Sequence, residues 1–259
     1  MNYKLPYIPE RDEKPRKKGL TMVMDKGLSM QEAENLCDSS GHLIDFLKLG
    51  FGTSLVSKNV KEKIKLFQQN NIRPYFGGTL FEAFVVRNMY DDFRKYVSTH
   101  NVDLVEVSDG SMHMEHDVKC EYIRKLSQEF TVISEVGTKD AGIIIAPNKW
   151  IKMMKNELAA GSVNVIAEAR ESGNVGIFKS NGNAHVVLIN KILENVPENS
   201  ILWEAPNKAQ QVWFVKLLGA DVNLGNIAPN EVISLETIRL GLRGDTFLHY
   251  LPDELKEED

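Results

Sequence analysis

Four glutamates each end a short apolar run, and successive members are separated by about the length of one strand-plus-helix unit. They are Glu106, Glu135, Glu168 and Glu204. Carboxylates that converge at one place repel one another, and a divalent cation relieves this repulsion. Oxygen ligands without a cysteine or histidine cluster favour Mg2+ over zinc. We therefore predict a magnesium site; the alternative is that some of these glutamates pair with lysines or point outward.

Three lysines lie at or just beyond the ends of predicted strands. Lys26 follows Asp25, Lys48 ends the second apolar run, and Lys139 follows "SEVGT". A lysine that is desolvated or close to a metal can act as an acid or base at neutral pH. The same residue type can form a Schiff base with a carbonyl substrate. We assign Lys139, Lys48 and Lys26 as catalytic candidates, and a salt bridge to one of the glutamates is the alternative for each.

Candidate anion-binding groups occur in two places. Arg170 lies two residues after Glu168, so it shares that side of an extended strand, and arginine binds carboxylate or phosphate bidentately. The stretch "VNLGNIAPNE" places Asn223, Gly225 and Asn226 before the next predicted helix, where barrel enzymes often bind phosphate. The loop after Arg170 is longer than usual for a strand–helix connection, which is typical of a lid.

The elements that position these residues alternate between strand and helix. Short apolar runs recur along the chain, in the stretches "GLTMVMDKG", "IDFLKLGFG", "IRPYFGG", "DLVEVSDG", "FTVISEVG", "VNVIAEAR", "ILWEAPN" and "ADVNLGN". Amphipathic stretches such as "PNKWIKMMKNELAAG" separate them. This pattern predicts an α/β protein with the (β/α)8 TIM barrel fold. An open doubly wound sheet is the competitor, but "GFGTSL" only approximates its glycine-rich fingerprint.

Composition limits the range of functions. The chain has 259 residues, of which 42% are hydrophobic and 26% charged, as in soluble globular proteins. The formal net charge of -5 argues against a nucleic-acid partner. No apolar run approaches the roughly 20 residues that span a bilayer, and the N-terminus lacks the apolar core of a signal peptide. Cys37 and Cys120 do not suggest a disulfide framework. We expect no membrane association and a cytoplasmic location.

We expect one catalytic domain with short extensions. Residues 1–18 form a polar N-terminal leader whose basic run, from Lys14 to Lys18, we interpret as solvated. Residues 19–251 form the barrel, and residues 252–259 form an acidic tail. Barrels often associate, so we expect a homo-oligomer.

With these stretches identified, the sequence resembles the phosphosulfolactate synthase family. The matching pieces cover nearly the whole chain in order, and they are "KPRKKGLTMVMDKG", "DFLKLGFGTS", "YFGGTLFE", "VEVSDGS", "VISEVGTK", "AEARESGNVGI", "WEAPNKAQQ", "LGNIAPNE" and "ETIRLGLRGDTF". In "VEVSDGS" we add Asp109 to the metal candidates and Ser111 to the anion-binding candidates. The resemblance implies a (β/α)8 barrel that adds sulfite to phosphoenolpyruvate with Mg2+, giving (2R)-phospho-3-sulfolactate.

Two other functions remain open at this point. One is a different barrel enzyme acting on a phosphorylated keto acid, such as a class I aldolase with Lys48 or Lys139 as its Schiff-base lysine. The other is a non-catalytic homologue, because a plant heat-stress-associated protein is also similar to this family. For the leading hypothesis, the resemblance implies that sulfite attacks C3 of phosphoenolpyruvate, that Mg2+ and cationic side chains stabilise the charge on its carboxylate, and that a lysine protonates C2.

Overall fold

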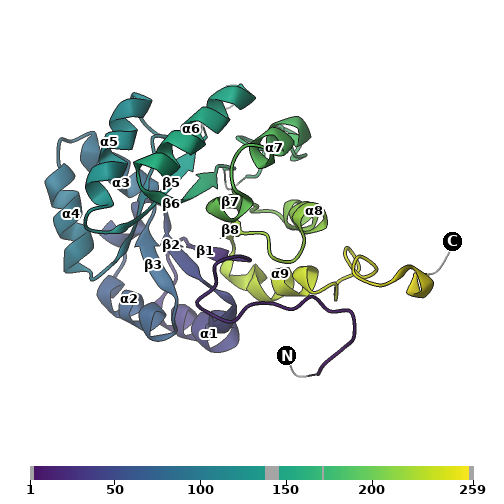
Figure 1. The fold of residues 1–259 in the computed structure, drawn as a ribbon. Coiled ribbons are helices and arrows are strands. Elements are labelled where there is room, and N and C mark those ends of the chain that lie inside the picture. The colour runs from purple at the N-terminus through teal and green to yellow at the C-terminus, as the bar shows by residue number, and fades with distance from the viewer. Residues whose placement is uncertain (1–2, 138–145, 171, 257–259) are drawn as a thin grey trace.

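The computed structural model describes residues 3–137, 146–170 and 172–256. Its parallel strands close into a barrel in sequence order, and helices surround them (Figure 1). The strands are β1 (Thr21–Asp25), β2 (Phe46–Leu49), β3 (Arg73–Phe76), β4 (Leu104–Val107), β5 (Thr131–Val136), β6 (Ser162–Ala167), β7 (Ile201–Glu204) and β8 (Leu224–Ile227). The predicted (β/α)8 barrel is confirmed, and the open doubly wound sheet is excluded.

The helices follow the strands in the order that the alternating pattern predicts. The α-helices are α1 (Met30–Ser40), α2 (Val60–Gln69), α3 (Gly78–Val85), α4 (Tyr90–Thr99), α5 (His116–Leu126), α6 (Pro147–Ala160), α7 (Val186–Leu193), α8 (Lys208–Leu218) and α9 (Val232–Arg239). The 3-10 helices are η1 (Gly41–Leu43), η2 (Gly50–Leu55), η3 (Glu198–Ser200), η4 (Pro229–Glu231) and η5 (Asp253–Leu255).

Local sequence signals account for several helix ends. Helix α1 begins with a capping box, in which Ser29 Oγ accepts from the backbone of Glu32 and the Glu32 carboxylate accepts from the backbone of Ser29. Helix α6 has Pro147 in its first turn, where the missing N–H costs nothing. It ends before Gly161, which has a φ of 121°.

The alternation of side chains along β7 decides which residues face the barrel interior. Trp203 is fully buried and stacks on Phe214 of α8, with 5.1 Å between ring centroids. Because successive side chains on a strand point to opposite faces, Glu204 faces inward. Lys48 of β2 pairs in register with Tyr75 of β3, so these two side chains also share one face. The barrel thereby directs charged groups from several strands toward one interior region.

Asp25, at the carboxyl end of β1, lies in a buried ion pair with Lys63 of α2. The Lys63 ammonium donates to Asp25 Oδ2 at 2.8 Å, and the side chains are 1% and 0% exposed. The other carboxylate oxygen accepts from the backbone N–H groups of Gly27 and Leu28. Both carboxylate oxygens of Asp25 therefore take part in contacts that hold the first strand–helix loop against α2.

We expect Lys63→Met to lower the free energy of unfolding by about 3–5 kcal/mol, because Asp25 would remain as an uncompensated buried charge. Urea unfolding at pH 7 measures the effect. Lys61→Met is the matched control, since Lys61 is exposed on the same helix. A loss below about 1 kcal/mol, the size expected for a surface pair, would contradict this interpretation of Asp25.

Two cations of the N-terminal basic run, Lys14 and Arg16, are docked on the barrel, whereas Lys17 and Lys18 are exposed as expected. The Lys14 ammonium donates to the backbone carbonyls of Gly41 and Ile44 at 2.9 and 2.6 Å. The Arg16 guanidinium pairs with Asp45 at 3.1 Å, with 5% and 6% of the two side chains exposed. These cations bind backbone carbonyls and a carboxylate near the amino ends of the strands, a role that a basic run does not reveal from sequence alone.

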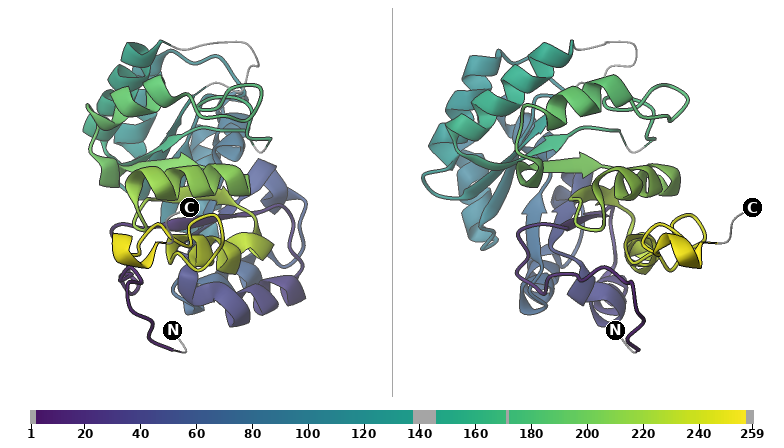
Figure 2. Two further views of the ribbon diagram at one scale, coloured as in Figure 1. Left: turned by 90° about the vertical axis from the view of Figure 1, so that its right-hand side faces the viewer. Right: turned by 45° about the vertical axis from the view of Figure 1, so that its right-hand side comes forward.

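The C-terminal residues after α9 extend away from the barrel (Figure 2). They include the 3-10 helix η5, and residues 257–259 lie outside the described part of the chain. Within the described residues, no helix combines the length and apolar character needed to cross a membrane.

Candidate active site

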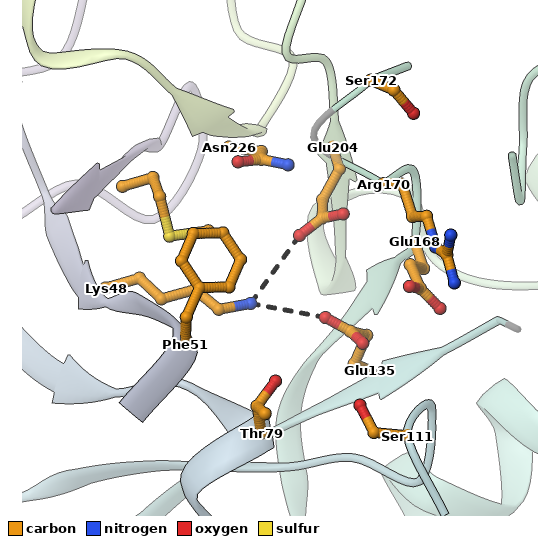
Figure 3. A pocket seen from close by; sticks show the side chains of 11 residues that line it. Lys48, Phe51, Thr79, Ser111, Glu135, Glu168, Arg170, Ser172, Glu204 and Asn226 are labelled. Atoms are coloured by element: carbon orange, nitrogen blue, oxygen red, sulfur yellow. Dashed lines mark hydrogen bonds and ion pairs between the residues drawn. The ribbon is translucent and has the colours of Figure 1, made fainter. Parts of the chain in front are cut away.

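A pocket of about 620 Å3 lies at the carboxyl ends of the strands (Figure 3). Strands β1, β2, β5, β7 and β8 contribute to it, together with η2, the first turn of α3 and the loops that follow β4 and β6. Its lining residues are Met24, Lys48, Phe51, Thr79, Ser111, Glu135, Glu168, Arg170, Ser172, Glu204 and Asn226. The structure thus brings together many of the residues predicted from sequence, namely Lys48, Ser111, Glu135, Glu168, Arg170, Glu204 and Asn226.

Lys48 stands among three of the four predicted glutamates. Its ammonium lies 3.0 Å from Glu106 Oε2, 3.3 Å from Glu135 Oε2 and 3.7 Å from Glu204 Oε1. All four residues are at least nine-tenths buried. Lys48 therefore forms salt bridges with three of the carboxylates predicted as metal ligands, so the alternative named for the lysine is observed.

One lysine cannot neutralise three buried carboxylates, and the pKa values of the cluster reflect this. Burial raises the pKa of Glu204 to about 8, although the positive charge of Lys48 opposes the rise. Burial also raises the pKa of Glu106 against the same opposing charge. Burial lowers the pKa of Lys48, but the Glu106 and Glu135 carboxylates outweigh it and hold that pKa well above its ordinary value. Lys48 is therefore a fixed positive charge at neutral pH.

Two glycines after β3 let these side chains approach the start of α3. A Cβ atom on Gly77 would lie 2.9 Å from Lys48 Cε, and one on Gly78 would lie 2.7 Å from Glu106 Oε1. The backbone N–H of Gly78 donates to Glu106 Oε1 at 2.6 Å. A side chain at either glycine would displace the cluster, which explains the "GG" of the "YFGGTLFE" stretch.

The loop that carries Arg170 is hydrogen-bonded to neighbouring elements. Asn207 Nδ2 donates to the carbonyl of Ser172 at 3.2 Å, and Gln210 Nε2 donates to the carbonyl of Gly173 at 2.7 Å. Asn226 Nδ2 donates to the carbonyl of Ala169 at 3.3 Å. These contacts from α8 and β8 hold much of the segment that sequence analysis interpreted as a lid.

Two of the predicted residues lie close to the pocket but do not line it. Glu106 belongs to the Lys48 cluster, yet both carboxylate oxygens face Lys48 and the start of α3. Gly225 lies within β8, paired in register with Glu204. A Cβ atom there would lie 2.8 Å from Met22 Cε, so this glycine packs in the barrel interior instead of forming a loop.

Three further predicted residues are placed elsewhere. Asn223 precedes β8 at the amino end of the barrel, where its amide donates to the carbonyl of Ile201 at 3.1 Å. Asp109 pairs at 2.9 Å with Lys119, a fully buried lysine of α5. Lys26 is exposed just beyond β1 and does not line the pocket. Lys139 falls outside the described residues.

The carboxylates of the pocket are not arranged as a complete metal cage. Among residues 3–137, 146–170 and 172–256, no three acidic, histidine or cysteine side chains are grouped so that they could hold a metal ion. The ammonium of Lys48 lies between Glu106, Glu135 and Glu204. Mg2+, however, commonly uses only one or two carboxylates and completes its shell with water and substrate oxygens. Glu135 and Glu168, which both line the pocket, suit that mode.

Several residues of the site were not predicted from the sequence. Met24, Phe51, Thr79 and Ser172 line the pocket. Tyr75 is fully buried on the strand next to Lys48, and burial raises the pKa of its hydroxyl, as does the negative charge of Glu106. Tyr75 and Lys48 are paired in the register of β2 and β3, so their side chains point to the same face. The sequence of each strand alone does not give this register.

Comparison with known proteins gives one consistent family. The family model described as (2R)-phospho-3-sulfolactate synthase (ComA) matches residues 9–245. The chain is 41% identical over 244 residues to the phosphosulfolactate synthase of Methanothermobacter thermautotrophicus, covering 92% of this chain and 95% of that protein. It is 38% identical over 243 residues to the phosphosulfolactate synthase of Bacillus subtilis, covering 93% and 96%.

Solved structures with much lower identity share the fold. The 3-hexulose-6-phosphate synthase of Salmonella typhimurium aligns with a TM-score of 0.55 at 12% identity, covering 86% of this chain and 100% of that one. The 3-keto-L-gulonate-6-phosphate decarboxylase of Vibrio cholerae aligns with a TM-score of 0.54 at 10% identity, covering 91% and 100%. At this identity the likeness extends to the barrel alone.

Proposed function

Because the chain belongs to the (2R)-phospho-3-sulfolactate synthase family, we propose that it adds sulfite to C3 of phosphoenolpyruvate. The product would be (2R)-phospho-3-sulfolactate, which makes the protein a carbon–sulfur lyase in classification. One observation carries the proposal: a single pocket at the carboxyl ends of the strands combines the cations Lys48 and Arg170 with the carboxylates Glu135 and Glu168. Such a pocket can accept anionic substrates while leaving carboxylates for a metal ion.

The substrates are anions, and the polar side of the pocket offers groups to bind them. Arg170 can bind phosphate or sulfite bidentately. Ser111 and Ser172 add hydroxyl donors from two other loop positions, and Asn226 adds an amide. We assign phosphate and sulfite recognition to these four residues.

The proposed Mg2+ would be held by Glu135 and Glu168 together with substrate oxygens and water. Both side chains are at least nine-tenths buried and line the pocket, and carboxylate oxygen is the donor that Mg2+ prefers. When bound, the ion would supply positive charge near the substrate carboxylate.

The chain's own residues would act on the reacting atoms as follows. The lone pair of the sulfite sulfur forms the new C3–S bond, and the C2–C3 π electrons move onto the substrate carboxylate. Lys48, fixed and protonated among its glutamates, stabilises the negative charge that develops there. A proton is then delivered to C2. The raised pKa of Lys48 makes it a poor proton donor, so we retain Lys139 as the proposed general acid.

The proposal is tested by following free sulfite when the protein, phosphoenolpyruvate and Mg2+ are mixed. We expect sulfite to disappear only when all three are present, with one phosphoenolpyruvate consumed per sulfite. Unchanged sulfite across pH 6–9 and across Mg2+ and Mn2+ would contradict the assignment.

Arg170→Met is expected to weaken substrate binding with less effect on the chemical step. Loss of one bidentate, charge-assisted contact corresponds to about 1.5–3 kcal/mol, so the KM for phosphoenolpyruvate or sulfite should rise about 10- to 150-fold. Steady-state kinetics with each substrate varied in turn identifies which anion Arg170 binds. Arg87→Met is the control, because Arg87 is exposed and lies away from the pocket lining. An unchanged KM for both substrates would remove Arg170 from the anion site.

The aldolase alternative requires a neutral lysine amine. Lys48 does not meet this requirement, since its neighbours hold its pKa well above the ordinary value. We expect borohydride reduction in the presence of a keto-acid substrate to leave Lys48 unmodified. Covalent trapping on Lys48 would favour the aldolase.

Two further features of the proposal concern assembly and location. The segment after α9 exposes large apolar side chains, namely Leu242, Phe247 and Leu248, and we propose that these contact a second copy of the chain in a homo-oligomer. Light scattering of the purified protein measures its mass directly. We also propose a cytoplasmic location, since phosphoenolpyruvate is a metabolite of the cell interior.

A further inference from the structure

Phe51 adopts an unusual backbone conformation beside the pocket. It lies in η2 with φ 53° and ψ 24°, the left-handed region, which costs a bulky residue about 1–3 kcal/mol. The next residue, Gly52, is also left-handed at φ 68°, but glycine adopts this conformation readily. The Phe51 side chain is 52% exposed, so its partial burial contributes only about 1 kcal/mol. This burial offsets at most the lower end of that cost.

Phe51 also differs in chemistry from most of the pocket. Of the described residues that line it, Met24 and Phe51 are the two with apolar side chains. The Met24 thioether packs directly against the backbone of Gly50, next to Phe51 in the chain. Figure 3 shows Phe51 on the side of the pocket opposite Glu168 and Arg170. The pocket thus has one apolar wall, and it faces the proposed metal- and anion-binding side chains.

We propose that Phe51 is a specificity-determining residue whose ring, with the Met24 thioether, forms the wall that contacts the C3 methylene of phosphoenolpyruvate. The inference rests on the proposed function. In phosphoenolpyruvate, C1 belongs to the carboxylate and C2 carries the phosphate oxygen, so C3 is the one carbon without a polar substituent. When the two anionic groups occupy the polar side, the methylene is left to face Met24 and Phe51.

This wall has a consequence for substrate choice. A methyl group added at C3 would meet the Phe51 ring, so the enzyme should discriminate against it. One methyl group in a shaped pocket corresponds to about 10- to 200-fold in kcat/KM. Removing the ring should raise kcat/KM for the substrate with the extra methyl group relative to that for phosphoenolpyruvate. Removing a purely structural residue would not produce this relative gain.

The test compares phosphoenolpyruvate with its 3-methyl analogue, phosphoenol-2-oxobutyrate, in the sulfite-addition assay. In Phe51→Ala and Phe51→Asn we expect kcat/KM for phosphoenolpyruvate, divided by kcat/KM for the 3-methyl analogue, to fall at least tenfold. Asparagine tolerates the left-handed conformation, so Phe51→Asn should unfold at the same temperature as the wild type or higher. Leu55→Ala is the matched control: Leu55 is 57% exposed in the same segment and lies outside the pocket lining, so its ratio should not change.

The outcomes separate this inference from the proposed function. If the wild type adds sulfite to phosphoenolpyruvate but the ratio is unchanged in both Phe51 variants, the specificity role is overturned and the proposed function stands. If both variants unfold, Phe51 is a structural residue and the inference is likewise overturned. If the wild type forms no product, the proposed function fails and this inference fails with it.

Discussion

Replacing Lys48 by methionine is expected to lower kcat/KM by about 100- to 1,000-fold, the size measured for removal of one preorganised electrostatic group. It should also lower the free energy of unfolding by about 3–5 kcal/mol at pH 8, because three buried carboxylates lose their counter-charge. Lys48 lies within 4 Å of Glu106, Glu135 and Glu204. Steady-state kinetics and urea unfolding measure the two effects separately.

The loss of stability in Lys48→Met should depend on pH in a defined direction. Without the lysine, the pKa values of Glu106 and Glu204 in the folded state, which burial already raises, rise further above the unfolded value of about 4.3. The folded state then binds more protons than the unfolded state, so the deficit is largest at high pH and shrinks as pH falls toward 5. Lys48→Arg, which keeps the charge, should lose less stability. A deficit that is constant from pH 8 to pH 5 would contradict the cluster's electrostatic role.

Replacing Glu135 or Glu168 by glutamine should reduce activity by on the order of 100-fold and weaken Mg2+ binding. Both side chains line the pocket, and glutamine removes the charge that binds a hard cation. Glu135 also pairs with Lys48 at 3.3 Å, so Glu135→Gln will combine two effects. Isothermal titration with Mg2+ in the presence of phosphoenolpyruvate measures the metal affinity apart from turnover.

Glu106→Gln is the matched control for the metal site. Glu106 belongs to the same buried cluster, but it does not line the pocket, and one of its oxygens accepts from the backbone of Gly78. We expect its substitution to alter stability while leaving Mg2+ affinity within about twofold. Full activity and unchanged Mg2+ affinity in both Glu135→Gln and Glu168→Gln would remove the proposed metal site.

The fold and the location of the site follow from the sequence because both depend on repeated patterns. Each glutamate ends an apolar run of a parallel strand, and the carboxyl ends of such strands meet at one mouth. Glu135, Glu168 and Glu204 accordingly line one pocket with Arg170. The sequence does not show which residues of each strand point into the barrel. For β7, the stacking of Trp203 on Phe214 of α8 shows that Trp203 points outward and Glu204 inward.

The errors in placement also have physical reasons. Asn223 was expected among the anion-binding groups, but "ADVNLGN" does not show where β8 begins; the strand starts one residue later, at Leu224, so Asn223 lies at its amino end. Asp109 was assigned to a metal, but its partner Lys119 lies on the next helix, and their 2.9 Å contact depends on how α5 packs on the barrel. The spacing of residues within a short stretch shows neither the register of a strand nor which residue a charged side chain will pair with.

Lys48 shows the limit most clearly. Its position at a strand end predicted a functional lysine, and the salt bridge to a glutamate was the stated alternative. Its contacts come from β4, β5 and β7, which are distant in sequence from β2. The closed barrel brings them together across its interior, and no local pattern specifies which glutamates a given lysine will meet.

The central claim is that this pocket joins sulfite to C3 of phosphoenolpyruvate. Its most direct test is 31P and 1H NMR of the wild-type protein with phosphoenolpyruvate, sulfite and Mg2+ in D2O. We predict that the vinyl proton signals disappear and that a phosphosulfolactate with one deuterium at C2 appears at the same rate. Persistence of phosphoenolpyruvate, or its conversion to any product without a carbon–sulfur bond, would contradict the account.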